Sequence, residues 1–84
     1  MITLLYFARL REAFGISSEQ VDLPPTVSDS AALLGWLRSR GGVWQEELAP
    51  GKPVRLAVNQ AMAAGATPLA DGDEVALFPP VTGG

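Results

Sequence analysis

The sequence ends in two glycines, Gly83 and Gly84, whose type and position best suit a chemical role. Glycine lacks a Cβ, so a terminal pair is thin and flexible enough to enter a narrow channel that would exclude a bulkier terminus. A terminal carboxylate is unreactive until activated, and attack on the α-phosphate of ATP gives an acyl-adenylate that a sulfur or nitrogen nucleophile can open. We therefore expect the Gly84 carboxylate to react and Gly83 to keep its path narrow.

The residues before the glycines support this interpretation, because an isolated Gly-Gly pair also occurs as an idle flexible end. A predicted last strand is followed directly by Pro79 and Pro80, which cannot continue the hydrogen bonding of a sheet. Only Val81 and Thr82 separate this stiffened exit from the glycines. The spacing predicts an extended tail over residues 79–84 that leaves a folded body.

Composition argues against several other functions. The 84 residues contain no cysteine and no histidine, which removes disulfides, thiolate metal sites, cysteine nucleophiles and side chains that titrate near neutrality. The formal charge of -3 offers no electrostatic footprint for nucleic acid. We expect no independent catalysis, no nucleic-acid partner, and no metal or cofactor bound by this chain alone. Asp71, Asp73 and Glu74 lack the ligand spacing of a calcium loop and indicate a solvated turn.

The remaining composition is that of a small globular protein. The length suits a single domain over residues 1–84. No apolar run approaches the length that spans a bilayer. The apolar start ends at Arg9 and has no basic stretch ahead of it, which favours a strand over a signal peptide. We expect a cytoplasmic location and no membrane partner.

Hydrophobic periodicity predicts four strands and a short return strand. The first is a nearly continuous apolar run, and the clearest of the others alternates apolar with polar residues, as a half-buried strand does. The expected strands cover residues 2–7, 20–23, 54–58, 61–64 and 74–78.

One short helical turn and one main helix are expected between these strands. The short turn covers residues 8–14. Thr26 suits the N-cap of the main helix, with Asp29 reaching back in a variant of the capping box, and the glycines at 41–42 stop it. The segment 43–48 suits an irregular turn with Trp44 as a plug. The apolar stripe of the main helix contains Val27, Ala31, Leu34 and Leu37.

This order of elements predicts an α+β fold, a mixed sheet with one main helix packed on one face, which is the β-grasp pattern. Side-chain alternation sends Leu56 and Leu77, with their valine neighbours, toward the helix and Phe78 away from it. Phe7, Phe78 and Met62 would then form an apolar patch on the free face, which predicts a partner site. The alternative is that loops or the segment around Trp44 cover this face.

The chain also resembles a known family. The segment Asp71 to Gly84 closely resembles the end of the small subunits of molybdopterin synthase, the MoaD-type sulfur carriers. Three upstream segments agree, so the resemblance covers essentially the whole chain. They are Tyr6-Phe7-Ala8-Arg9 followed by Arg11-Glu12, then Pro25-Thr26-Val27, and then Ala57-Val58-Asn59-Gln60.

The resemblance implies a ubiquitin-like carrier whose Gly84 carboxylate is adenylated, with ATP, by an E1-like partner enzyme. Sulfur from a donor protein then converts it to a thiocarboxylate. The tail, with Pro79, Pro80, Val81 and Thr82, would insert into the large subunit of molybdopterin synthase in a heterotetramer. There, two sulfur transfers build the dithiolene of molybdopterin from cyclic pyranopterin monophosphate, and the large subunit supplies the catalytic side chains. The contact with that subunit corresponds to Phe7, Met62 and Phe78.

Three alternatives stay open at this point. A sulfur carrier for another pathway, such as thiamine synthesis, would share the fold and the glycines, although the Phe78-Pro79-Pro80 lead-in favours the molybdopterin family. A ubiquitin-like protein modifier would need the same adenylation but would form isopeptide bonds to lysines. A plain binding domain would have an idle tail. Arginines 9, 11, 38 and 40 could pair with an acidic partner rim, although surface arginines usually only solvate.

Overall fold

The computed structural model describes residues 1–63 and 65–80, so the predicted reactive end, Gly83 and Gly84, lies outside the described residues. The elements run in the order β1 (Ile2–Tyr6), α1 (Ala8–Phe14), β2 (Ser18–Val21), α2 (Ser30–Arg38), α3 (Gly42–Glu47), β3 (Arg55–Val58), β4 (Ala61–Met62) and β5 (Glu74–Phe78).

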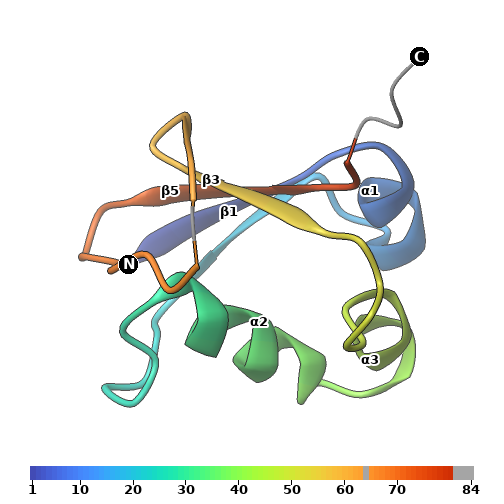
Figure 1. Cartoon of the computed structure of the whole chain (residues 1–84), viewed down its shortest axis with the longest axis horizontal. Coiled ribbons are helices and arrows are strands. Elements are labelled where there is room, and N and C mark those ends of the chain that lie inside the picture. Colours follow the sequence, from blue (N-terminus) through green and yellow to red (C-terminus); the bar gives the residue numbers. More distant parts are fainter. Residues whose placement is uncertain (64, 81–84) are drawn as a thin grey trace.

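The five strands form one mixed sheet in the order β2-β1-β5-β3-β4. The central strands β1 and β5 are parallel, and the other neighbouring pairs are antiparallel. Helix α2 lies across one face of the sheet, and α3 follows it on the same side (Figure 1). The predicted α+β fold with a mixed sheet and one main helix on one face is confirmed.

The core lies between the sheet and α2, and strand alternation determines which residues enter it. On β1, Leu4 and Tyr6 are buried, and on β5, Val75 and Leu77 have no exposed surface. They pack with residues of α2 in one hydrophobic cluster. Burying each such aliphatic side chain stabilises the fold by about 1.5–3 kcal/mol, so this layer supplies the main driving force for folding.

Strands β1 and β3 are each one residue shorter than predicted, and two strands differ by two residues. Strand β2 covers Ser18–Val21, whereas alternation placed it at 20–23. Its pairing with β1 runs from Ile2 opposite Val21 to Leu5 opposite Ser18, so the start of β1 limits how far β2 extends. Strand β4 contains only two residues, and the predicted return strand over 61–64 is too long.

The predicted start of the main helix was wrong. Helix α2 begins at Ser30, and the N-cap is Asp29, whose Oδ1 accepts a hydrogen bond from the Ala32 backbone N–H at 2.8 Å. Thr26 lies in a turn in which the Val27 N–H donates to the Pro24 carbonyl, so Val27 precedes the helix.

The predicted apolar stripe of the helix is therefore only partly correct. The buried residues of α2 are Ser30, Leu33 and Leu37, whereas Ala31 is exposed. Ser30 is polar and fully buried, and its hydroxyl donates to the Gly65 carbonyl at 2.9 Å. That hydrogen bond offsets the cost of burying the hydroxyl and ties the helix start to the loop before β5.

The segment 43–48, predicted as an irregular turn, is mostly helical, and Gly42, expected to stop the main helix, begins α3 instead. The prediction that Trp44 acts as a plug is confirmed. Its ring stacks on Phe14 of α1 with ring centroids 3.8 Å apart and meets Tyr6 of β1 edge to face at 5.5 Å. Trp44 thus packs α3 against α1 and the end of β1, and does not cover the free face of the sheet.

A polar network closes over these aromatic rings. The Tyr6 hydroxyl donates to Glu19 at 2.6 Å, and the Arg40 guanidinium donates to both oxygens of the same carboxylate at 2.8 and 3.0 Å. The guanidinium also lies 4.5 Å from the centre of the Trp44 ring. The hydrogen bonds from Arg40 hold the pKa of Glu19 below its ordinary value, while burial raises the pKa of the Tyr6 hydroxyl.

The helix-start assignment is tested by comparing Asp29→Ala with Thr26→Ala. Removing the Asp29 carboxylate deprives the Ala32 N–H of its partner, so we expect the free energy of unfolding to fall by about 1 kcal/mol. Thr26→Ala should change it by less than about 0.5 kcal/mol. Urea unfolding measures both, and equal losses would contradict the assignment of Asp29 as the N-cap.

The Glu19 network predicts a pH-dependent stability. Because the folded-state pKa of Glu19 is lowered, its contribution is complete above the ordinary value of 4.5 and is lost as the pH falls toward the folded value. Glu19→Gln should therefore be less stable than wild type at pH 7, and the difference should shrink toward pH 3. Denaturant unfolding at both pH values measures this, with the exposed Glu46→Gln as control. A difference that is constant with pH would disprove the linkage.

Candidate functional site

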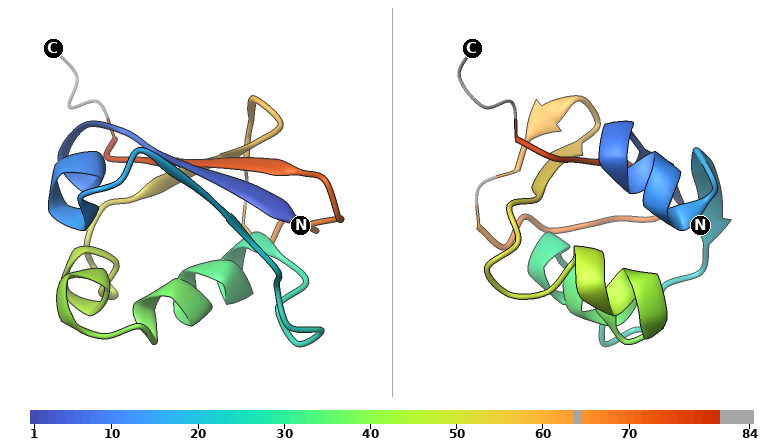
Figure 2. Two further views of the ribbon diagram at one scale, coloured as in Figure 1. Left: turned by 180° about the vertical axis from the view of Figure 1, so that it is seen from behind. Right: turned by 90° about the vertical axis from the view of Figure 1, so that its right-hand side faces the viewer.

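The face of the sheet opposite α2 is the candidate site. In the described part of the chain, no helix crosses this face, as the two views in Figure 2 also show. Two of the residues predicted to lie there are among the most exposed large hydrophobic side chains of the protein. Phe7 is 46% exposed and Met62 is 57% exposed. Phe78, the third, is half-buried.

Sheet register brings these side chains together. Tyr6 pairs with Leu77, and the Phe7 N–H donates to the Leu77 carbonyl at 3.2 Å, so Phe7 and Phe78 lie side by side at the end of the two central strands. On the other side of β5, Ala57 pairs with both Ala76 and Met62. We call this outward row of apolar residues the docking face: Leu5, Phe7, Ala57, Met62, Ala76 and Phe78.

Sequence reasoning missed three members of the docking face, namely Leu5, Ala57 and Ala76. The signal for all three was available, because they share the strand parity of Phe7, Met62 and Phe78. Alanine attracts little attention in a hydrophobic pattern. Ala57 is only 9% exposed, so it adds little to the surface of this face.

The position of Phe7 depends on an unusual backbone conformation. The residue that follows it, Ala8, has a φ of 52°, in the left-handed region that favours glycine. The chain thereby turns sharply from β1 into α1, with Phe7 as the residue before the helix. Leu10 then enters the core while Phe7 stays outside, and the core contact of α1 holds the turn in place.

Met62 is positioned by the turn between β3 and β4. Asn59 and Gln60 both have positive φ, at 50° and 69°, as expected for a two-residue hairpin turn, and the predicted turn at this position is confirmed. The Asn59 side chain donates to Asp73 at 2.9 Å and accepts from the Glu74 N–H at 3.0 Å. These hydrogen bonds fasten the hairpin to the start of β5.

The carboxylates of Asp71 and Asp73, in the turn before β5, already have partners within the protein. Hydrogen bonds from the Asn59 side chain and the Ala70 N–H hold the pKa of Asp73 below its ordinary value. Asp71 pairs with the amino group of Met1. Within residues 1–63 and 65–80, no three acidic side chains gather closely enough to hold a metal ion.

Of the predicted tail over residues 79–84, the structure describes only the first two residues. Pro79 and Pro80 continue from β5 and are half-buried beside the docking face. Val81, Thr82, Gly83 and Gly84 lie outside the described residues, so their predicted roles stay predictions. In the described part of the chain, no helix is long and apolar enough to cross a membrane.

Comparison with known proteins assigns the family. The model of the ThiS family matches residues 4–84. The chain belongs to the ThiS family. It is also 44% identical, over the full length of both proteins, to the molybdopterin synthase sulfur carrier subunit of Escherichia coli K12. The resemblance to this group of carriers, and the ubiquitin-like β-grasp fold that it implied, are thereby confirmed.

Solved structures with the same fold extend the comparison. The complex of subunits 1 and 2 of the molybdopterin-converting factor from Helicobacter pylori contains a chain that is 25% identical, with a TM-score of 0.68 and coverage of 99% of this chain and 97% of that one. The crystal structure of SAMP1 from Haloferax volcanii is 32% identical, with a TM-score of 0.64 and coverage of 99% and 98%.

Proposed function

We propose that this ThiS-family chain is the sulfur carrier subunit of a molybdopterin synthase. The observation that carries this function is the 44% identity over the full length of the Escherichia coli carrier subunit, with no uncovered part on either chain. The geometry fits a carrier: a rigid sheet leads into a tail, and an apolar face lies beside the point where the tail leaves.

The chemistry of the tail follows from the carboxylate of Gly84. That carboxylate attacks the α-phosphate of ATP in an adenylating enzyme, which releases pyrophosphate and forms an acyl-adenylate. Hydrosulfide supplied by a donor protein then attacks the carbonyl carbon, the carbon–oxygen bond to AMP breaks as the carbon–sulfur bond forms, and the group becomes a thiocarboxylate. Gly83 and Gly84 carry no side chain beyond hydrogen, so the carbonyl can be reached from either side inside a narrow channel.

The docking face aims this group into the partner. The tail leaves β5 immediately after Phe78, and Phe7 lies next to that residue, so a protein that covers both side chains also receives the tail. The Helicobacter pylori complex of subunits 1 and 2 supports a large subunit as that partner. The chain has no cysteine or histidine, so in this division of labour the large subunit supplies the catalytic groups.

A second function has a specific observation in its favour. SAMP1 of Haloferax volcanii, a small archaeal modifier protein, has the same fold and 32% identity. A modifier would use the same adenylated terminus to form isopeptide bonds. Cellular proteins whose gel shifts vanish when Gly84 is deleted would favour the modifier, whereas synthase activity restored by a chemically made thiocarboxylate would favour the carrier.

The carrier function predicts a defined modification of the chain end. Protein purified from cells that retain the pathway should contain a fraction that is heavier by the difference between sulfur and oxygen, located at Gly84. Intact and fragment mass spectrometry measure this, with the Gly84 deletion as control. If only the unmodified mass appears when the activating enzyme, ATP and a sulfur donor are all present, the carrier function is wrong.

The docking face predicts where binding energy is concentrated. Phe7→Ala removes an exposed aromatic anchor, so we expect the affinity for the large subunit of the same organism to fall by about 2 kcal/mol, roughly thirty-fold in Kd. Gln45→Ala, which removes an exposed side chain of α3 on the helix side of the sheet, should leave Kd within about twofold. Calorimetry compares them, and equal effects of the two substitutions would contradict the assigned face.

A further inference from the structure

Charged side chains are distributed unevenly along the molecule, which is 35 Å in its longest dimension. The end of β5 and the start of α1 lie together at what we call the tail end, and the start of β5 lies at the far end (Figure 1). Five of the nine acidic residues lie at the far end, on the β2–α2 loop, at the α2 N-cap and around the start of β5. They are Asp22, Asp29, Asp71, Asp73 and Glu74.

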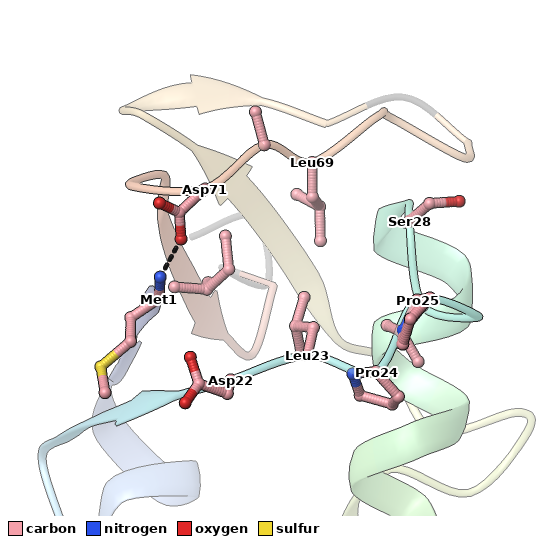
Figure 3. A pocket seen from close by; sticks show the side chains of 11 residues that line it. Met1, Asp22, Leu23, Pro24, Pro25, Ser28, Leu69 and Asp71 are labelled. Atoms are coloured by element: carbon pink, nitrogen blue, oxygen red, sulfur yellow. Dashed lines mark hydrogen bonds and ion pairs between the residues drawn. The ribbon is translucent and has the colours of Figure 1, made fainter.

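The far end has little positive charge to offset these carboxylates. In the described residues, the amino group of Met1 is its single cation, and it pairs with Asp71 at the mouth of a hollow that Asp22 also lines (Figure 3). The six basic side chains of the protein all belong to other parts of the chain: α1, the C-terminal end of α2 and the residues just after it, the segment before β3, and the first residue of β3.

Three of these cations belong to elements that border the tail end, and we call them the basic collar: Arg11, Lys52 and Arg55. Arg55 lies directly opposite Phe78 on the neighbouring strand. Lys52 belongs to the loop before β3, and Arg11 to the helix that begins directly after Phe7. All three side chains are exposed. The right-hand view of Figure 2 looks onto this end.

The collar is not neutralised internally. Ion pairs within the described residues use the Met1 amino group, Arg9 and Arg40, and leave the three collar side chains without a carboxylate partner. Arg9 is excluded from the collar because its Nε lies 3.1 Å from Glu47. The collar thus presents net positive charge at the border of an apolar face, although the protein as a whole has a formal charge of -3.

Screening decides which charges a docking partner experiences. At physiological ionic strength the Debye length is about 8 Å, far shorter than the long axis of the molecule. A protein that approaches the tail end therefore interacts with the collar, and the far-end carboxylates contribute little. At about 0.01 M salt the Debye length grows to roughly 30 Å, and the far end is then felt as well.

We propose that the basic collar recognises an acidic rim around the channel that receives the tail on the large subunit. This inference rests on the proposed function and specifies the charge of the two surfaces that meet: positive on this chain and negative on the large subunit. The apolar docking face supplies affinity, while the collar steers the tail end toward the channel and speeds association, since complementary charges at an interface act mainly on the association rate. The far-end carboxylates disfavour the reversed orientation.

The experiment compares two variants with the same net charge. Lys52→Gln with Arg55→Gln removes two collar charges, and Thr26→Glu with Ser28→Glu adds two negative charges at exposed positions of the far end. Stopped-flow association with the large subunit is measured at 0.15 M and 0.01 M salt. At 0.15 M we expect the collar variant to associate about five- to tenfold more slowly than wild type, and the far-end variant to match wild type within about twofold. The dissociation rate should change little.

Further measurements separate the outcomes. Lys52→Arg with Arg55→Lys keeps both charges and should restore the wild-type rate, whereas a loss caused by altered packing would persist. At 0.01 M salt the far-end variant should also slow. If the wild-type chain binds and both double variants associate equally fast at 0.15 M, or if association is insensitive to salt, the collar is overturned and the proposed function stands. If wild-type protein does not bind the large subunit at all, the proposed function fails and the collar with it.

Discussion

The parallel pairing of β1 with β5 is the contact on which the rest of the structure depends. Strand β2 pairs with β1 and β3 pairs with β5, and β4 is joined to the sheet through β3. Because the pairing joins the first strand to the last, it must form across nearly the whole chain, which makes it entropically costly and slow to assemble. Its register also sets Phe7 beside Phe78, so the contact that completes the fold also completes the docking face.

One sheet serves two purposes through side-chain alternation. Leu77 is fully buried under α2, while its neighbours Ala76 and Phe78 face outward. In a chain of 84 residues, which buries only about 60–65% of its unfolded surface, α2 and α3 both lie on one side of the sheet (Figure 1). The other side of the sheet therefore remains available to a partner.

Period-two patterns predicted β3 and β5 well, because burial on one face is recorded directly in the residue types, and a nearly continuous apolar run predicted β1. Helix boundaries were harder to predict. Thr26 and Asp29 are both good caps, and the choice between them depends on the turn at Pro24 and on the pairing of Ser30 with the loop at Gly65, contacts that no local pattern contains. In the docking face, the two phenylalanines and Met62 were found, whereas Leu5 and the two alanines were missed. Alanine suits either side of a sheet, and in β1 both parities are apolar.

The parallel arrangement of the two central strands has a topological consequence for anything attached to this protein. Met1 precedes β1 and pairs with Asp71 at the turn that precedes β5, whereas the tail begins where both strands end. A fusion partner, fluorophore or surface linker joined ahead of Met1 would therefore sit at the opposite end of the central strands from the tail. The architecture separates a tether at Met1 from the tail by the length of the central strands.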